Sequence, residues 1–365
     1  MAHQVLIIGG QGRIGTQVAA DILHYTEAAV TVTGRQPRPD ALPPRCTFLP
    51  LDLADQAAVT AAIARHDLVI HCAGPFSYRD LAVLTACIDQ GVNYLDVADN
   101  PRYVQAALQL RTAAQTQGVT AIVSTGVFPG ISNSMVRQGI EQLEAAETVR
   151  LSYVVAGSGG AGVTVMRTTF LEVQEPITAW LDGQWQAVPA YSDREMVTFP
   201  APYHRCGVYW FNTVEALTLA TSFPVKTVIT KFGSTPDVYN RLTWATAHLA
   251  PPGWLRQPSV IEFLARVSYG MTTISDRFTG IGLAMRADID GYHQGQPTRY
   301  TATFAHADTA AAAGMGTGSL AQLILTGQLT QPGVWPVEQA LPTPQFQQTC
   351  HQRQLVIESA LHQLN

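Results

Sequence analysis

The first third of the chain alternates short apolar runs with amphipathic segments. Runs such as Val5–Ile8 and Leu68–Ile70 lack polar side chains, which is typical of strands buried on both faces of a sheet. After the first run, Ile14, Val18 and Ile22 fall on one helical face. Strands alternating with helices predict βαβ units and a parallel sheet. The predicted strands cover residues 5–8, 30–33, 48–49, 68–70, 93–97 and 121–123, with helices over 13–25, 55–63, 81–91 and 100–118.

The pattern changes after about Val127, where strands no longer alternate regularly with helices. This mixed order indicates an α+β domain for substrate binding or dimerisation. We therefore expect an α/β protein of two domains, residues 1–127 and 128–344, with a helix at 345–365 as a candidate to pack back on the first. The elements predicted in the second part are strands at 151–156, 225–232 and 284–289 and helices at 320–325 and 345–364.

The two lysines and a second glycine-rich stretch are expected to have structural roles. Lys226 and Lys231 are the only lysines, and their odd separation on one strand points them to opposite faces, so a surface role is expected for both. The stretch Gly314–Ser319 follows an alanine-rich helical segment, which is the wrong context for a dinucleotide loop. Ser319 is expected to cap the helix that follows it.

Composition narrows the class of protein. Of the 365 residues 47% are hydrophobic, which excludes disorder as the main state, and only 13% are charged. The net charge of −5 and the lack of a basic block exclude nucleic-acid binding. A lightly charged surface leaves room for a subunit interface, and we expect a homodimer. No apolar run reaches the length of a membrane span.

The cysteines and the N-terminal residues bear on the compartment. Five cysteines are scattered through the chain without a C-x-x-C pair or a zinc-ligand spacing, so we expect no metal site and reduced thiols. No signal-peptide pattern is present at the N-terminus. A soluble, cytoplasmic protein is the expectation.

The strongest chemical signal is a glycine loop between the first strand and the first helix. Residues 10–15 read G-Q-G-R-I-G, which fits G-x-G-x-x-G in the context that dinucleotide binding requires. Gly10 allows a tight turn, Gly12 lets the backbone approach a pyrophosphate, and Gly15 lets the helix pack on the strand. The helix N-terminus then offers free N–H groups to the phosphates, beside Arg13 and Ile14. The alternative is a purely structural turn.

The end of the second strand indicates which dinucleotide is bound. NAD-binding domains usually place an acidic residue there, whereas this strand ends in Thr33-Gly34-Arg35. A guanidinium at Arg35 is suited to a 2′-phosphate, with Arg13 and Arg38 adding positive charge. We therefore predict NADP(H); the alternative is a surface arginine in a turn. Asp52, after the third strand, is either an adenine contact or a turn residue.

The fourth strand leads into Ala73-Gly74-Pro75, a loop predicted to lie at the carboxyl edge of the sheet, where ligands bind. Gly74 would let the backbone pass close to the cofactor and Pro75 would stiffen the loop. Cys72 is interpreted as a small buried side chain, not a nucleophile, and His71 as packed under the sheet.

Several segments together resemble one family. Their order and spacing agree from the N-terminus to about Met135, and Gly333–Glu338 adds a weaker match. The segments are Gly9–Gly15, Thr33–Arg35, Leu51–Leu53, Ala73–Phe76, Gly91–Asp96 and Gly126–Asn133. In these segments the chain resembles the saccharopine dehydrogenase (saccharopine reductase) family of NADP-binding oxidoreductases.

The resemblance carries expectations about fold and chemistry. It implies a Rossmann-type domain, a small-molecule substrate and a reaction at a C–N bond, either reduction of an imine or oxidation of a secondary amine. It also implies that Pro129, Gly130 and Asn133 lie on the substrate side. Phe128 stands where the family pattern often has an acidic residue.

Catalytic candidates come from the predicted carboxyl edge of the sheet. No tyrosine has a lysine four residues later, which excludes the Tyr-x-x-x-Lys mechanism, and H-E-x-x-H and G-x-S-x-G are absent. Tyr78 or Asp99 is the hypothetical proton donor, and Arg79 or Arg102 would hold a substrate carboxylate. The alternatives are helix capping for Asp99 and a solvated helix face for the arginines. A second function class also stays open, namely an NADP(H)-binding regulatory or scaffold protein without turnover.

Overall fold

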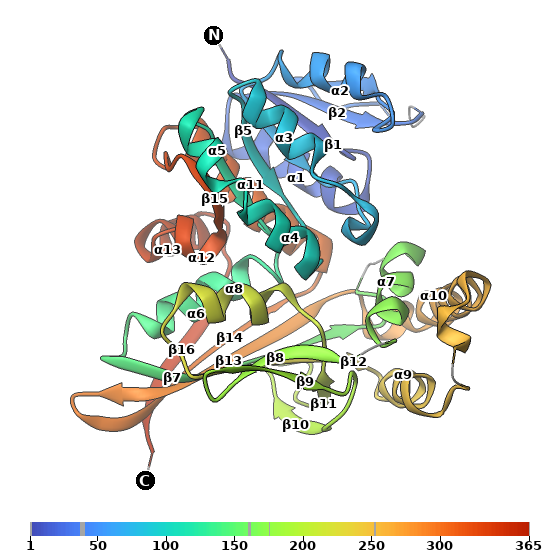
Figure 1. Cartoon of the computed structure of the whole chain (residues 1–365), viewed down its shortest axis with the longest axis vertical. Coiled ribbons are helices and arrows are strands. Elements are labelled where there is room, and N and C mark those ends of the chain that lie inside the picture. The colour runs from blue at the N-terminus through green and yellow to red at the C-terminus, as the bar shows by residue number, and fades with distance from the viewer. Residues whose placement is uncertain (1, 37–40, 160–161, 175, 252, 365) are drawn as a thin grey trace. The chain divides into compact units, whose positions relative to one another are not determined.

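The computed structural model describes residues 2–36, 41–159, 162–174, 176–251 and 253–364 (Figure 1). Arg38, one of the arginines considered for the 2′-phosphate, lies outside them. The chain forms two compact units. Unit 1 comprises Met1–Ile131 and Ala310–Thr349, and unit 2 comprises Ser132–Thr309 and Cys350–Asn365. Residues 310–344, which the sequence pattern assigned to the second domain, thus lie in unit 1.

Within the described residues, unit 1 is built on a seven-stranded sheet in the order β15-β6-β5-β4-β1-β2-β3. All of its strand pairs are parallel, as the alternating pattern predicts. Residues 310–349 join this unit because β15 pairs with β6 from Gly333 to Pro336. The strands are β1 (Gln4–Ile8), β2 (Ala29–Gly34), β3 (Cys46–Pro50), β4 (Leu68–His71), β5 (Asn93–Asp96), β6 (Thr120–Val123) and β15 (Gly333–Pro336).

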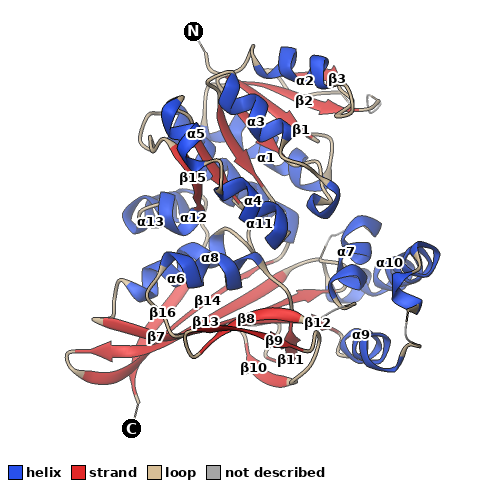
Figure 2. Ribbon diagram, viewed as in Figure 1, coloured by secondary structure: helices blue, strands red, loops and turns tan. Residues whose placement is uncertain are grey.

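Helices cover this sheet (Figure 2). The helix predicted over 100–118 is two helices, α4 and α5. The glycine stretch 314–318 lies inside α11, where an added Cβ at Gly316 would come within 2.4 Å of the Gly126 carbonyl oxygen. Ser319 is therefore a helical residue that donates to the Gly316 carbonyl, not a cap. The helices are α1 (Arg13–Tyr25), α2 (Gln56–Ile63), η1 (Phe76–Tyr78), α3 (Ala82–Asp89), α4 (Pro101–Leu108), α5 (Arg111–Thr116), α11 (Thr309–Leu325), α12 (Val337–Ala340) and α13 (Thr343–Gln352).

Unit 2 contains a mixed sheet, nine-stranded within the described residues, in the order β10-β11-β12-β7-β13-β14-β16, with β8 and β9 attached at β12. The long hairpin of β13 and β14 and the strand β7 form its centre. The strands are β7 (Ala145–Ala156), β8 (Ile177–Leu181), β9 (Gln184–Val188), β10 (Glu195–Thr198), β11 (Arg205–Trp210), β12 (Thr227–Thr235), β13 (Leu283–His293), β14 (Gln296–His306) and β16 (Ile357–Gln363).

The helices of unit 2 fall into two groups. Figure 2 shows α6 and α8 lying along one face of the sheet, while α7, α9 and α10 gather at one end of it. The bounds are α6 (Ile131–Ile140), α7 (Val163–Glu172), α8 (Val214–Ser222), α9 (Val238–Leu249), η2 (Trp254–Arg256) and α10 (Pro258–Thr279).

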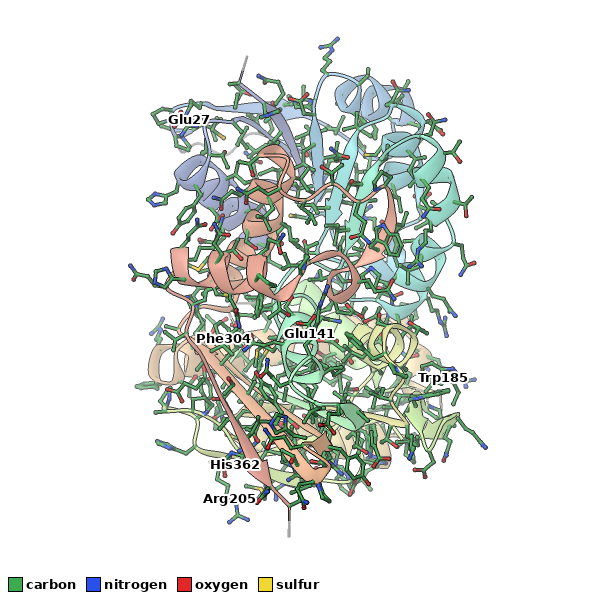
Figure 3. The ribbon with its side chains drawn as sticks, turned by 90° about the vertical axis from the view of Figure 1, so that its left-hand side faces the viewer. Glu27, Glu141, Trp185, Arg205, Phe304 and His362 are labelled. Atoms are coloured by element: carbon green, nitrogen blue, oxygen red, sulfur yellow. The ribbon has the colours of Figure 1, made fainter. Side chains whose placement is uncertain are left out.

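Two further predictions for unit 2 are wrong. The helix expected at 345–364 ends at Gln352, and the residues after it form β16, which pairs antiparallel with β14. His362 of this edge strand lies at the surface in Figure 3. Lys231 is not at the surface, because it is 3% exposed and its ammonium bonds Asp193 and Glu195. Lys226 is exposed, as expected, and pairs with Glu147.

Candidate functional site

The glycine loop turns tightly from β1 into α1. The Gly12 amide donates to the Gly9 carbonyl at 2.8 Å, and the Gly9 amide donates to the Thr33 hydroxyl of β2 at 3.1 Å. Each glycine has a separate reason to lack a side chain. A Cβ at Gly10 would lie 2.7 Å from the Val32 Cβ, and one at Gly15 would lie 2.4 Å from the Gly9 carbonyl oxygen. These two glycines therefore permit the close packing of β1, β2 and α1.

Gly12 is less closely surrounded than the other two glycines. A Cβ there would meet only the Gly9 carbonyl oxygen, at 3.0 Å, among the described atoms. Gly12 is also the N-cap of α1, where no side chain caps the helix and no acidic residue occupies the first turn. Arg13 is exposed beside it, and Ile14 is half-buried. The positive end of α1 is thus left for an anion, so the loop fits a dinucleotide pyrophosphate.

The end of β2 lies against the same loop. A Cβ at Gly34 would come within 2.5 Å of the Gln11 side-chain oxygen, so Gly34 is the residue that lets Gln11 pack on the strand. Arg35 follows directly and is exposed. No hydrogen bond or ion pair holds its guanidinium within the described part of the chain. This placement keeps it available for a phosphate on the ribose.

Asp52 lies in the turn between β3 and α2. It is exposed, and its carboxylate accepts a hydrogen bond from the Ala54 amide at 3.0 Å. Of the two alternatives, this contact is the one expected of a turn residue. The adenine contact stays a prediction.

The loop after β4 is held in place by an arginine. Arg79 Nε donates to the Ala73 carbonyl at 2.8 Å, which ties η1 back to the segment Ala73-Gly74-Pro75. A Cβ at Gly9 would lie 2.9 Å from the Ala73 Cα, so this segment packs directly on the glycine loop. The structure therefore places the segment Ala73-Gly74-Pro75 at the glycine loop, which it contacts through Ala73. At least one N–H group of Arg79 is therefore bonded to this loop and not to a ligand.

The other candidates differ in accessibility. Tyr78 is 60% exposed at the end of η1, and Arg102 is exposed on the first turn of α4. Asp99 is exposed immediately before Asn100, whose side chain caps α4 by accepting from the Tyr103 amide. Asn100 therefore caps α4. Because β4 and β5 are parallel neighbours, the segments that hold Tyr78 and Asp99 leave the same edge of the sheet.

Of the residues expected on the substrate side, Pro129 and Gly130 lie between β6 and α6, and Asn133 lies in the first turn of α6. Pro129 is buried beside Gly130, which has a φ of +133° and whose Cβ would overlap the Gly126 carbonyl. Gly130 is therefore required by a tight turn. Asn133 is 2% exposed, and its side-chain amide donates to the Thr218 hydroxyl within unit 2.

A buried polar network at the ends of β4 and β5 was not among the sequence candidates. The Tyr94 hydroxyl lies 3.1 Å from the Asp96 Oδ2, 3.0 Å from the Tyr103 hydroxyl and 3.3 Å from the His71 Nδ1. Tyr94 has one proton, which it donates to Asp96, so Tyr103 and His71 Nδ1 donate to Tyr94. The only sequence signal is the spacing of Tyr94 and Asp96, which puts both on one face of β5.

Burial sets the protonation of this network. Asp96 has no exposed surface, and burial raises its pKa to about 6, although amide donors at Ser124 and Ala98 act in the opposite direction. Burial, and then the charge of Arg79, lowers the pKa of His71 to about 3, so this imidazole is neutral. Burial likewise raises the pKa of the Cys72 thiol, which argues against a nucleophilic thiolate there.

Two negative findings complete the site. Among the described residues, no group of three or more His, Cys, Asp or Glu side chains is arranged to hold a metal ion. In the same part of the chain, none of the helices combines the length and apolarity that crossing a bilayer requires.

These features define unit 1 as a Rossmann-type dinucleotide-binding domain, joined in one chain to a mixed-sheet unit. Comparison with known families then identifies it further. Residues 5–122 match the family model of the saccharopine dehydrogenase NADP binding domain. Unit 1 therefore contains a domain that matches the NADP-binding domain of this family. The resemblance read from the motifs and the predicted cofactor, NADP(H), are confirmed.

Individual relatives match more of the chain at lower similarity. Carboxynorspermidine synthase of Vibrio cholerae is 25% identical over 316 residues, which cover 76% of this chain and 74% of that protein. Saccharopine dehydrogenase [NADP(+), L-glutamate-forming] of Pyricularia oryzae is 30% identical over 151 residues, covering 40% of this chain and 32% of the relative.

Solved structures match the whole fold. Saccharopine dehydrogenase (L-Glu forming) of Saccharomyces cerevisiae superposes with a TM-score of 0.67 at 14% identity, over 99% of this chain and 100% of that one. The DAP dehydrogenase of C. glutamicum gives a TM-score of 0.51 at 13% identity, over 97% of this chain and 99% of that one. At such identities the likeness establishes the two-part fold.

Proposed function

We propose that this protein is an NADP-dependent oxidoreductase that transfers hydride to or from a C–N bond of an amino-acid-like substrate. The observation that carries the proposal is the exposed, uncapped start of α1 at Gly12, together with the exposed Arg35 after β2, in a domain that matches an NADP-binding family. The C–N chemistry is supported by the names of two relatives, a carboxynorspermidine synthase and a saccharopine dehydrogenase.

The protein's part in the reaction is to bind, orient and manage one proton. When bound, NADPH supplies the hydride. The α1 terminus and Arg35 would fix the phosphates, while the Ala73–Pro75 loop, held by Arg79, would border the reacting end of the cofactor. Imine reduction also needs a proton at nitrogen, and we assign it to Tyr78 or Asp99 at the same sheet edge.

We assign the substrate carboxylate to Arg102 ahead of Arg79. Arg102 is exposed on the first turn of α4, whereas the Arg79 Nε is already bonded to the Ala73 carbonyl. A planar guanidinium binds a carboxylate through two parallel hydrogen bonds, which would also orient the substrate.

The test is multiple-turnover consumption of NADPH. The protein, at a concentration far below that of NADPH, is incubated with amines paired with α-keto acids or aldehydes, and the loss of the reduced nicotinamide absorbance is followed. An enzyme consumes many equivalents of NADPH with at least one pair. Tight binding without consumption across the panel contradicts the proposal and favours a regulatory NADP(H)-binding protein.

Single substitutions then assign the roles. Loss of the true proton donor, by Tyr78→Phe or Asp99→Asn, should lower kcat by roughly 100-fold or more. Arg102→Ala should mainly raise KM for the carboxylate-bearing substrate. Ser77→Ala, an exposed neighbour in η1, is the matched control and should change neither constant.

A further inference from the structure

Helix α10 carries an apolar stripe that the described residues of unit 2 leave exposed. The helix is 22 residues long, and five large apolar side chains on it are strongly exposed. They recur at intervals of four, four, three and four residues, which places them on one helical face within about 100°. The exposed fractions are Phe263 64%, Val267 42%, Met271 38%, Ile274 66% and Phe278 86%.

The opposite face of α10 fixes the helix to its unit. Ile261, Ala265 and Thr272 are buried, and Figure 1 shows α10 beside α7 at one end of the sheet. Arg167 of α7 forms an ion pair with Glu262 at 2.6 Å. The Tyr239 hydroxyl of α9 lies 2.9 Å from the Ser275 hydroxyl. The stripe therefore lies on the exposed face of a helix whose opposite face is buried in unit 2.

The stripe has an internal symmetry about the bond between Gly270 and Met271. Phe263 and Phe278 lie at equal distances from that midpoint along the helix, and so do Val267 and Ile274. Each residue of the stripe thus has a counterpart of similar size at the mirrored position, except at the centre. There the counterpart of Met271 is Gly270, which has no neighbouring atom within 4 Å of an added Cβ among the described residues.

We propose that α10 is a self-association surface on which two copies of this chain pair antiparallel about a two-fold axis. A two-fold interface requires that residue i meets residue j while j meets i, and the symmetric stripe satisfies this. Each Phe263 meets the partner's Phe278, and each Val267 meets the partner's Ile274. Each Met271 fills the space over the partner's Gly270. Aromatic pairing at both ends and a large side chain over glycine at the centre give complementary packing.

The charge pattern favours this occupant over others. No charged residue interrupts the stripe, and Arg266 and Arg277 lie only on one flank, where they stay in water. The stripe spans about 22 Å at the usual helical rise. An interface of this length lies at the small end of specific interfaces, so we expect weak association, with a dissociation constant on the order of micromolar.

The first experiment measures mass against concentration. Sedimentation of the full chain from about 1 to about 200 µM should show a monomer–dimer equilibrium in this range. Ile274→Asp should raise the dissociation constant roughly 100-fold, because an interfacial carboxylate loses its water without gaining a partner. Thr273→Asp adds the same charge one residue away on the exposed polar side of the helix and should leave the equilibrium unchanged. Unfolding midpoints show that both variants are folded.

The second experiment tests the antiparallel register. Phe263→Lys and Phe278→Glu should each weaken the dimer, because each leaves unpaired charges in the interface. The two changes in one chain should restore association, since the lysine introduced at position 263 then faces the glutamate introduced at position 278 of the other copy. A parallel pair would bring like charges together in the double variant and would not recover.

Three results overturn the proposal. A wild-type chain that stays monomeric at about 200 µM has no such surface at the strength the stripe predicts. A dimer that Ile274→Asp leaves intact uses another surface. A monomer that sediments with vesicles of phosphatidylglycerol and phosphatidylcholine, and loses this with Ile274→Asp, uses the stripe on lipid. None of these results bears on NADPH turnover, so the proposed function stands or falls separately.

Discussion

Asp96 shows how a single residue can link three elements of unit 1. Its carboxylate accepts from the Ser124 amide at 2.7 Å, the Ala98 amide at 3.0 Å and the Tyr94 hydroxyl. These donors come from β5 itself and from the segments that follow β5 and β6, at the edge of the sheet where the loop after β4 also begins. Three donors on a buried carboxyl group satisfy its oxygens and hold these segments together.

The raised pKa of Asp96 predicts a pH-dependent free energy of unfolding. The unfolded chain ionises this group near its ordinary value of 3.8, whereas the folded chain holds the proton to about pH 6. Between those values the unfolded state binds fewer protons, so this group's contribution is full below pH 4 and is lost as the pH rises through 6. Asp96→Asn should remove that loss, which amounts to about 3 kcal/mol at most.

Urea unfolding of both proteins at several pH values measures the effect of Asp96. Other carboxyl groups, such as Asp290 beside Arg299, have lowered pKa values and act with the opposite sign at lower pH. The difference between wild type and Asp96→Asn cancels their contribution. Two curves that stay parallel from pH 4 to 7 would refute the assignment.

Arg35 predicts the preference between NADPH and NADH. Its guanidinium is exposed after β2, where it would make charge-assisted hydrogen bonds to a 2′-phosphate. Arg35→Ala should weaken NADPH binding by roughly 10- to 100-fold, since such bonds contribute about 1.5–3 kcal/mol. NADH binding should barely change. Calorimetric titration measures both, with exposed Arg65→Ala as the matched control.

At the residue scale the sequence predicts contacts that are local and misses those that depend on register. The glycine loop was recognisable because its residues are contiguous and each has a steric reason to be glycine. The contact of His71 with Tyr94 depends on β4 lying beside β5 in one particular register. Lys231 was placed at the surface because its acidic partners, Asp193 and Glu195, reach it only after β10 and the turn before it fold against β11 and β12.

At the scale of elements, the central parallel strands were predictable and the edge strand of unit 2 was not. The strands β1, β4 and β6 are buried along almost their whole length, so their sequences are nearly continuous apolar runs. The strand β16 is mostly exposed and is held by backbone pairing to β14, which leaves little hydrophobic pattern. Helix α10 is absent from the predicted elements because its apolar residues occupy two opposite faces, which hides the single-face period.

The junction of β1 and α1 predicts different outcomes for two similar substitutions. Gly12→Ala adds a methyl group whose single close neighbour among the described atoms is the Gly9 carbonyl oxygen, at 3.0 Å, and alanine accepts the φ of −67°, so the free energy of unfolding should fall by no more than about 1 kcal/mol. The same methyl group would occupy the place of the pyrophosphate, and NADPH affinity should fall at least about tenfold.

Gly15→Ala should instead lower stability, because its Cβ would lie 2.4 Å from the Gly9 carbonyl oxygen and force the helix away from the strand. A loss of about 1–3 kcal/mol is the usual result of such overpacking. Thermal unfolding with and without NADPH separates the two effects. If both variants lose stability equally and Gly12→Ala keeps its NADPH affinity, Gly12 is a structural residue and its exposed side is not a ligand site.

At the scale of the whole molecule, unit 1 is completed by a segment that comes after Ser132–Thr309 in the chain. Helix α11 packs on the main body of the unit through glycines, since a Cβ at Gly314 would overlap Gln17 and one at Gly318 would overlap Asp21. The strand β15 then extends the parallel sheet at β6. The sequence pattern predicts this segment in the second domain because it follows that domain along the chain, whereas the packing of α11 and the pairing of β15 assign it to unit 1.

This discontinuity makes a prediction about which parts of the chain bind NADPH. A chain ending at Thr309 keeps every residue assigned to the cofactor but loses α11 and β15, which exposes the face of α1 that holds Gln17 and Asp21 and the edge of β6. It should bind NADPH at least about 100-fold more weakly than the full chain, because the unfolding of unit 1 then competes with binding.

Joining Met1–Ile131 to Ala310–Thr349 through a short flexible linker restores both elements and should recover the affinity, although this joined chain lacks all of Ser132–Thr309. Equal affinity in the chain ending at Thr309 would show that Met1–Ile131 folds without the later segment. Failure of the joined chain to bind, when circular dichroism shows it folded, would show that unit 2 contributes directly to the cofactor site.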